Sequence, residues 1–214
     1  MENLWELIKR HRIFAVIRTD TPESALKAAR ACLQGGMRII EITLTVPKAL
    51  EVIKELAREE GPVVGAGTVT DAEKAKAAIS AGAKFIVSPT IETEVIKTCK
   101  EARTFVSTGA LTPTEVLRAW REGSDLVKVF PAASLGGYQY IKALKEPLPY
   151  IELMPSVGVD LENFIQFLEA GAAAVCLSDT LIDKRAVNQG DWSKITRLAK
   201  KYIEKLEAYQ TRLA

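Results

Sequence analysis

The stretch Arg38-Ile39-Ile40-Glu41-Ile42-Thr43-Leu44-Thr45 decides the fold, because it reads as a strand with apolar side chains on both faces. Val46-Pro47 follows it as a helix start, Gly61 closes the helical interval, and a second apolar run begins at Val63. Two strands joined by a crossover of helix length pair in parallel. Strands that are apolar on both faces belong to a sheet that is covered on both sides. The stretch therefore predicts a buried β–α–β unit.

The same unit recurs along the chain, about every 19–25 residues. Eight runs of the strand type are present: Ile13–Arg18, Arg38–Thr45, Val63–Val69, Phe85–Pro89, Thr104–Gly109, Leu126–Pro131, Ile151–Val157 and Ala174–Asp179. Eight strand–helix units predict a closed (β/α)8 TIM barrel, with Leu4–His11 as an N-terminal helix that covers its bottom. The alternative is an open doubly wound sheet, but no GxGxxG motif follows the first run. We find no linker and predict one barrel domain over residues 1–214.

Composition excludes several classes of function. Of the residues, 48% are hydrophobic, and 29 Lys+Arg face 27 Asp+Glu, so neither disorder nor a basic nucleic-acid surface is expected. No apolar run is long enough to span a membrane, and the first ten residues resemble an amphipathic helix rather than a signal peptide. Three separated cysteines, Cys32, Cys99 and Cys176, predict reduced thiols in a cytoplasmic protein. With one histidine, His11, a His-based metal site or a Ser-His-Asp triad is not expected.

Polar residues collect where the predicted strands end. Active sites of (β/α)8 barrels lie at the C-terminal ends of the strands. Those ends carry Arg18, Glu41, Thr43, Thr45, Thr68, Ser88, Pro89, Thr90, Ser107, Thr108, Lys128, Pro155, Ser156, Ser178 and Asp179. We therefore expect the chemistry to come from this set.

Lys128 is the most informative member of the set. It lies in Leu126-Val127-Lys128-Val129-Phe130-Pro131, a run with no other charge. If its side chain points into the barrel, burial favours the neutral amine, a nucleophile that forms a Schiff base with a ketone. The alternative is a lysine that extends outward into solvent from a strand edge.

Glu41 and Arg18 extend the candidate site. A carboxylate on a buried strand must be paired or take part in chemistry, so Glu41 is either a structural partner of a buried lysine or a proton carrier beside it. Arg18 ends the first run and could bind a substrate carboxylate through two hydrogen bonds, or simply lie in solvent. Thr68 follows two glycines that allow close backbone approach or merely fit the tapering barrel. Cys176 is expected to be a buried, inert thiol.

Six motifs in order along the chain resemble one known family. They are Glu41-Ile42-Thr43-Leu44-Thr45, Gly65-Ala66-Gly67-Thr68-Val69, Phe85-Ile86-Val87-Ser88-Pro89, Leu111-Thr112-Pro113-Thr114-Glu115, Val127-Lys128-Val129-Phe130-Pro131-Ala132 and Tyr140-Ile141-Lys142-Ala143-Leu144. From about Ile13 to Ile182 the chain is similar to the 2-keto-3-deoxy-6-phosphogluconate (KDPG) / 4-hydroxy-2-oxoglutarate (KHG) aldolase family. This resemblance implies a class I aldolase, a lyase that forms pyruvate from a small 2-keto acid, with no metal or cofactor and usually a homotrimer.

The resemblance also implies roles for individual residues. Lys128 falls on the family's Schiff-base lysine, and Glu41 on its acid/base glutamate. Thr68 falls on a residue that helps to hold the pyruvate carboxylate, and Pro89 packs near the substrate. Some members carry an arginine for that carboxylate where this chain has Thr45, whereas others place it at the end of the first strand, as Arg18 is here. The substrate-binding set is therefore Arg18, Thr68, Pro89 and Thr45, with the carboxylate assigned to Arg18 and Thr68.

The chain departs from the family at its two phosphate-binding turns. The resemblance implies phosphate contacts at Ser156, Gly158 and Ser178. Val157 and Leu177 stand where the family has glycines, and a β-branched valine resists a positive φ. Asp179 adds negative charge. These changes predict weakened phosphate binding, so a non-phosphorylated 2-keto acid is an alternative substrate.

Two other functions are alternatives to an aldolase. The altered turns are compatible with a non-catalytic or engineered oligomeric scaffold or binding protein derived from this barrel, although the presence of Lys128 and Glu41 opposes that reading. Another phosphate-binding barrel enzyme, such as an isomerase, would not need a lysine on the sixth strand.

Overall fold

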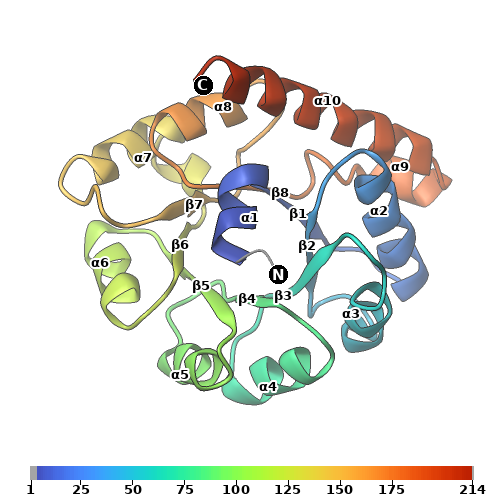
Figure 1. The fold of residues 1–214 in the computed structure, drawn as a ribbon, viewed down its shortest axis with the longest axis horizontal. Coiled ribbons are helices and arrows are strands. Elements are labelled where there is room, and N and C mark those ends of the chain that lie inside the picture. Colours follow the sequence, from blue (N-terminus) through green and yellow to red (C-terminus); the bar gives the residue numbers. More distant parts are fainter. Residues whose placement is uncertain (1–3, 214) are drawn as a thin grey trace.

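The computed structural model describes residues 4–213 and shows eight parallel strands with helices around them (Figure 1). The strands are β1 (Ile13–Ile17), β2 (Ile39–Thr43), β3 (Val63–Gly67), β4 (Phe85–Val87), β5 (Phe105–Ala110), β6 (Leu126–Val129), β7 (Leu153–Pro155) and β8 (Val175–Leu177). The helices are α1 (Leu4–His11), α2 (Pro22–Gln34), α3 (Ala49–Leu56), α4 (Ala72–Ser80), α5 (Thr93–Glu101), α6 (Pro113–Arg121), α7 (Tyr138–Lys145), α8 (Phe164–Glu169), α9 (Lys184–Gln189) and α10 (Trp192–Thr211), with a 3-10 turn, η1 (Ala132–Leu135).

The strands form a nearly closed barrel. Their order is β7-β6-β5-β4-β3-β2-β1-β8, and each pairs in parallel with its neighbours. At the seam between β7 and β8, Ala173 donates its backbone N–H to Leu153 O at 2.9 Å. The predicted (β/α)8 barrel is thus confirmed. The domain bounds of 1–214 remain a prediction, and residues 1–3 and 214 lie outside the described part.

Local sequence signals explain where the helices begin. The Thr21 side chain accepts from Ser24 N ahead of α2, and Thr112 forms a capping box with Glu115 at the start of α6. Asp71 caps α4 in the same way, by accepting from Lys74 N. The helix α1 forms as predicted and lies across one end of the barrel (Figure 1).

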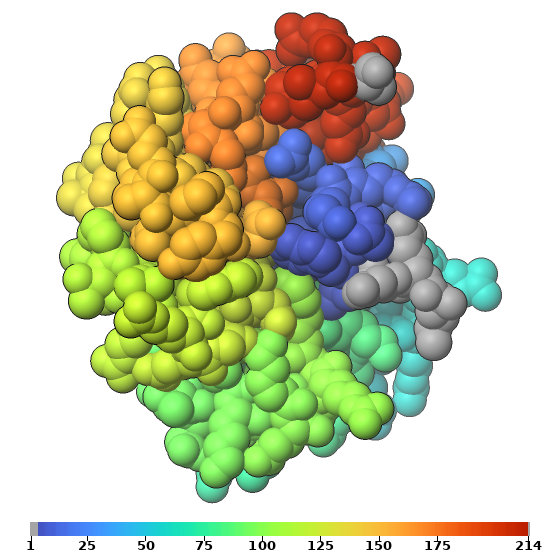
Figure 2. Space-filling model, turned by 60° about the vertical axis from the view of Figure 1, so that its left-hand side comes forward, coloured from blue at the N-terminus to red at the C-terminus, as the bar shows by residue number. Residues whose placement is uncertain are grey.

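Alternation along the strands divides the core into two clusters. One side of each strand packs under the surrounding helices, as Ile40 and Ile42 of β2 do. The other side fills the barrel, where Phe14 and Phe85 meet edge to face at 5.2 Å. The α1 helix closes the bottom of this inner cluster, with Ile8 buried in it. In Figure 2 the blue N-terminal part lies beside the red C-terminal helix, where Gln210 donates to Arg10 O at 2.8 Å.

Glycines make room for the inner side chains. A Cβ at Gly65 would lie 2.4 Å from the Phe85 ring, and a Cβ at Gly67 would lie 1.9 Å from Glu41 Oε1. Both contacts are shorter than packing allows, so these two glycines are required by what fills the barrel. The sequence leaves open whether these glycines allow close backbone approach or merely fit the barrel, and the packing of Phe85 and Glu41 against them favours the second.

Candidate active site

The inner face of β6 carries Lys128 into the barrel. Within the strand, Leu126 belongs to the inner cluster while Val127 and Val129 belong to the outer one, so Lys128 shares the side of Leu126. Lys128 is only 7% exposed. The alternative of a lysine that extends into solvent is therefore wrong, and an amine stands inside the mouth of the barrel.

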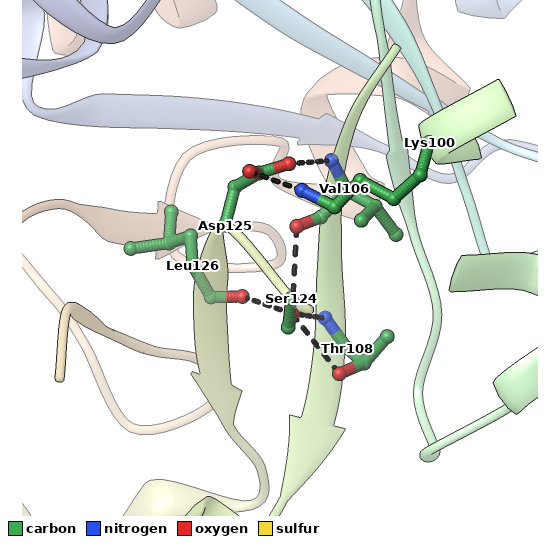
Figure 3. Close-up of polar contacts among 6 residues, drawn as sticks. All are labelled: Lys100, Val106, Thr108, Ser124, Asp125 and Leu126. Carbon is green, nitrogen blue, oxygen red and sulfur yellow. Dashed lines mark hydrogen bonds and ion pairs between the residues drawn. The ribbon is translucent and has the colours of Figure 1, made fainter. Parts of the chain in front are cut away.

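A polar network holds β6 in register with β5 just before Lys128 (Figure 3). Ser124 Oγ accepts from Thr108 N at 3.0 Å and lies 2.9 Å from Leu126 O, to which it donates. The Asp125 carboxylate accepts from Val106 N at 2.9 Å and pairs with Lys100. These bonds set Lys128 opposite Gly109 on β5. Sequence reasoning missed Ser124 and Asp125; their signal was a Ser-Asp pair directly ahead of a buried strand.

Glu41 points into the same space from β2. It is 1% exposed, and within residues 4–213 neither carboxylate oxygen has a hydrogen-bond partner. Burial raises the pKa of Glu41, while attraction to Lys128 and Arg18 opposes that rise. An unpartnered, desolvated carboxyl near an amine is able to exchange a proton with a bound molecule.

Arg18 and Thr68 lie together at the mouth. Arg18 Nη2 donates to Thr68 Oγ1 at 3.5 Å, which joins the end of β1 to the residue after β3. Thr68 has φ 59, a left-handed conformation that turns the chain directly after Gly67. Arg18 is exposed and Thr68 half-buried, so both are open to a small anion.

The other two predicted substrate contacts, Thr45 and Pro89, each pack against a neighbouring strand residue. Thr45 Oγ1 lies 2.8 Å from Thr43 Oγ1, which in turn donates to Ile17 O at 3.1 Å, so Thr45 is tied to the end of β2. Pro89 follows β4, and its carbonyl oxygen would lie 1.9 Å from a Cβ at Gly109, so only a glycine fits there. The ring of Phe130, which is 37% exposed, has its centroid 5.4 Å from Lys128 Nζ.

Cys176 is an inert neighbour of the pair. Its thiol is buried on the inner face of β8, and burial raises its pKa to about 12, helped by the charge of Glu41. The raised pKa disfavours the reactive thiolate at neutral pH, and the predicted burial of Cys176 is confirmed.

The turn after β7 adopts the conformation that its sequence was expected to resist. Val157 has φ 71 and Gly158 has φ 81, so two successive residues are left-handed. A β-branched residue is strained in the left-handed region, because its Cβ crowds the backbone. The backbone of Val157 and Gly158 packs closely against the turn that contains Ala133. Ala133 N donates to Val157 O at 3.3 Å, and a Cβ at Gly158 would lie 2.4 Å from Ala133 Cβ. Leu177, the last residue of β8, is buried in the outer core cluster, so its side chain packs under the helices and not into the barrel.

No group of three or more His, Cys, Asp or Glu side chains suitable for a metal ion occurs within residues 4–213. In the same part of the chain, no helix has the length and apolar content to cross a membrane.

The raised pKa of Glu41 predicts a pH-dependent cost to stability. Since the folded-state pKa lies above the unfolded value, the contribution favours folding at low pH and is lost as the pH rises through the folded pKa. We expect Glu41→Gln to become progressively more stable than the parent protein as the pH rises above 4.5, the ordinary value. Denaturant unfolding at a series of pH values measures this difference.

An exposed glutamate on α5 provides the control for that experiment. Glu94→Gln should show no such trend, because Glu94 is solvated. Parallel stability curves for Glu41→Gln and the parent would contradict the buried, unpartnered state of Glu41.

Comparisons with known proteins agree with this geometry. A family model described as "Aldolase: KDPG and KHG aldolase" matches residues 4–198. A 2-dehydro-3-deoxy-phosphogluconate aldolase of Treponema pallidum is 31% identical over 205 residues, which cover 95% of this chain and 98% of the relative.

Two solved structures are similar over most of the chain. The KDPG aldolase of Legionella pneumophila, with pyruvate captured as a covalent carbinolamine intermediate, has a TM-score of 0.86 and 25% identity, covering 94% of this chain and 98% of that one. A cube-shaped cage designed by fusing symmetric oligomeric domains has a TM-score of 0.84 and 31% identity, covering 94% of this chain and 74% of the other.

Proposed function

The chain belongs to the KDPG and KHG aldolase family, and on that premise we propose that it is a class I aldolase in which Lys128 forms the Schiff base. Its substrates are KDPG, cleaved to pyruvate and glyceraldehyde 3-phosphate, and/or KHG, cleaved to pyruvate and glyoxylate. The observation that carries the proposal is the buried Lys128 amine, which shares the inside of the barrel with the unpartnered carboxyl of Glu41.

The proposed reaction uses these two groups in turn. The neutral amine of Lys128 attacks the C2 ketone, and loss of water gives a cationic imine that accepts electrons. Glu41 takes the proton of the C4 hydroxyl as the C3–C4 bond breaks, and its electrons pass into the imine to form an enamine. The aldehyde leaves, the enamine is protonated at C3, and water releases pyruvate from Lys128. Arg18 and Thr68 hold the C1 carboxylate throughout.

Borohydride trapping with pyruvate tests the Schiff base directly. Reduction of the imine should leave a stable adduct on one peptide, the one that contains Lys128, as read by mass spectrometry. An adduct on a different lysine, or none, would contradict the proposal.

Arg18→Gln tests the carboxylate site. Loss of a charge-assisted hydrogen bond is worth roughly 1.5–3 kcal/mol, so we expect KM to rise by about 10- to 150-fold, with a smaller change in kcat. Arg121→Gln, on the exposed face of α6, is the matched control and should leave both constants unchanged. An unchanged KM in Arg18→Gln would remove Arg18 from the site.

We also propose that the protein is a cytoplasmic homotrimer. A cyclic trimer buries two different faces of each subunit. Two hollows on different elements suit this: one of about 390 Å³ beside Leu50 of α3, and one of about 410 Å³ between Ile91, Leu111 and Phe130. Sedimentation velocity at micromolar concentration should give a trimer, and a monomer would contradict it.

A further inference from the structure

A hollow of about 680 Å³ opens at the bottom of the barrel, the end opposite the mouth that holds Lys128. Its walls come from the α1 helix, from the C-terminal end of α6 and from the starts of β5, β6 and β7. Ligand sites in proteins commonly have about 300–1,000 Å³. Active sites of (β/α)8 barrels lie at the other end, so the proposed aldolase reaction makes no use of this hollow.

Aromatic side chains form much of its wall. The chain has three tryptophans, and two of them, Trp5 and Trp120, line the hollow together with Phe105 and Tyr150. The rings of Trp5 and Phe105 are stacked, with their centroids 5.9 Å apart and an angle of 20° between their planes. Tyr150 is 56% exposed and both tryptophans are half-buried, so part of each ring is open to a bound molecule.

The charged side chains that line the hollow are acidic. They are Asp125 and Glu152, and the described lining residues include no lysine, arginine or histidine. Among the cations of the same segments, Lys100 pairs with Asp125, Lys145 donates to two backbone carbonyl oxygens, and Arg121 is exposed on α6. Within residues 4–213 the carboxylate of Glu152 has no hydrogen bond or ion pair. Glu152 can therefore balance the charge of a cation that enters the hollow.

Aromatic rings and an unpaired carboxylate together favour an organic cation. The faces of tryptophan and tyrosine rings attract positive charge, and quaternary ammonium groups are recognised in this way. An anion would meet Asp125 and Glu152 with no lining cation to offset them. A metal ion would lack ligands, because no group of three or more His, Cys, Asp or Glu side chains suited to one occurs in the described part of the chain.

We propose that this hollow binds a small organic cation, with its positive centre among Trp5, Trp120 and Tyr150 and its charge balanced by Glu152. The hydrogen-bonded network ahead of β6 forms part of the wall (Figure 3), so the site rests on ordered backbone. The site shares no residue with the proposed aldolase site. The proposal therefore stands or falls independently of the proposed function.

Choline tests the proposal against its neutral isostere, 3,3-dimethylbutan-1-ol, in which carbon replaces the nitrogen. Trp192→Phe provides the background, because Trp5 and Trp120 then supply the tryptophan fluorescence. Trp192 begins α10, away from α6 (Figure 1). We expect choline to change the emission saturably and to bind at least about tenfold more tightly than the isostere. Equal binding of the two, or no saturation by about 10 mM choline, would overturn the proposal.

Two variants locate the cation in the hollow. Glu152→Gln removes the charge, keeps the shape of the side chain and should weaken choline binding about fivefold without affecting the isostere. Trp120→Leu keeps an apolar side chain but removes the ring, and should weaken choline binding about 2- to 30-fold. Glu94→Gln, which changes an exposed glutamate on α5, is the control and should bind choline as the parent does. Parental affinity in both Glu152→Gln and Trp120→Leu would contradict this site.

A second copy of this chain is the other occupant to test. If the hollow were a contact between copies, choline would not bind, and Trp120→Leu would lower the sedimentation coefficient of the assembly. That pair of results would replace the proposal. Thermal unfolding of each variant without ligand checks that it is folded, and Glu152→Gln keeps the test decisive if Trp120→Leu does not fold.

Discussion

Replacing Lys128 with alanine is expected to lower kcat/KM by roughly 10⁴-fold or more and to abolish borohydride trapping with pyruvate. Without the amine no imine forms, and the electrons of the C3–C4 bond have no acceptor. Lys128 is buried, so alanine also leaves a cavity. Lys128→Met keeps the stem of the side chain and should lose activity to the same extent.

Lys97→Ala is the control for both variants, since Lys97 is an exposed lysine on α5. It should retain full activity and a full yield of adduct. Measurable turnover in a folded Lys128→Met protein, checked by thermal unfolding, would show that the reaction does not proceed through this lysine.

Glu41→Gln is expected to separate imine formation from cleavage. General acid–base catalysis contributes about 10²- to 10⁴-fold, so kcat should fall by that amount. Pyruvate has no C4 hydroxyl, and its adduct on Lys128 should still be trapped. Glutamine matches the shape of glutamate, so the packing against Gly67 is preserved.

The pH profile adds a second observation on the same residue. Because burial raises the pKa of Glu41, the acidic limb of kcat/KM should lie above the ordinary glutamate range and disappear in Glu41→Gln. Glu94→Gln should keep the parent profile. If Glu41→Gln cleaved substrate at the parent rate, Glu41 would be a structural partner of Lys128 and not the proton carrier.

The strand pattern predicted the barrel because hydrophobic periodicity and helix caps are local signals. Each predicted run contains a strand, but the run Ile151–Val157 yields only Leu153–Pro155. The ends of such runs leave the sheet. The pattern of apolar residues alone does not show at which residue the strand-to-strand hydrogen bonds stop. Lys128 and Glu41 were recognised for the same local reason, since each is a charge within an apolar strand.

What depends on distant partners could not be predicted. The reason for Gly67 is Glu41 on the neighbouring strand, and the left-handed Val157 is explained by its contact with the turn of Ala133. Neither partner is near in sequence. The Ser124–Asp125 network likewise acts on β5, and it becomes visible only when β5 and β6 lie side by side (Figure 3).

The seam between β7 and β8 is the break in the barrel's ladder of paired strands, as far as residues 4–213 show. Within the described residues, no strand ladder joins β7 to β8, whereas every other neighbouring pair is in register. Breathing motions concentrate where few backbone bonds must break. Lys128 on β6 and Glu41 on β2 both lie off this seam. A separation of β7 from β8 would leave the ladder from β2 to β6 intact, so Lys128 and Glu41 would keep their positions relative to each other.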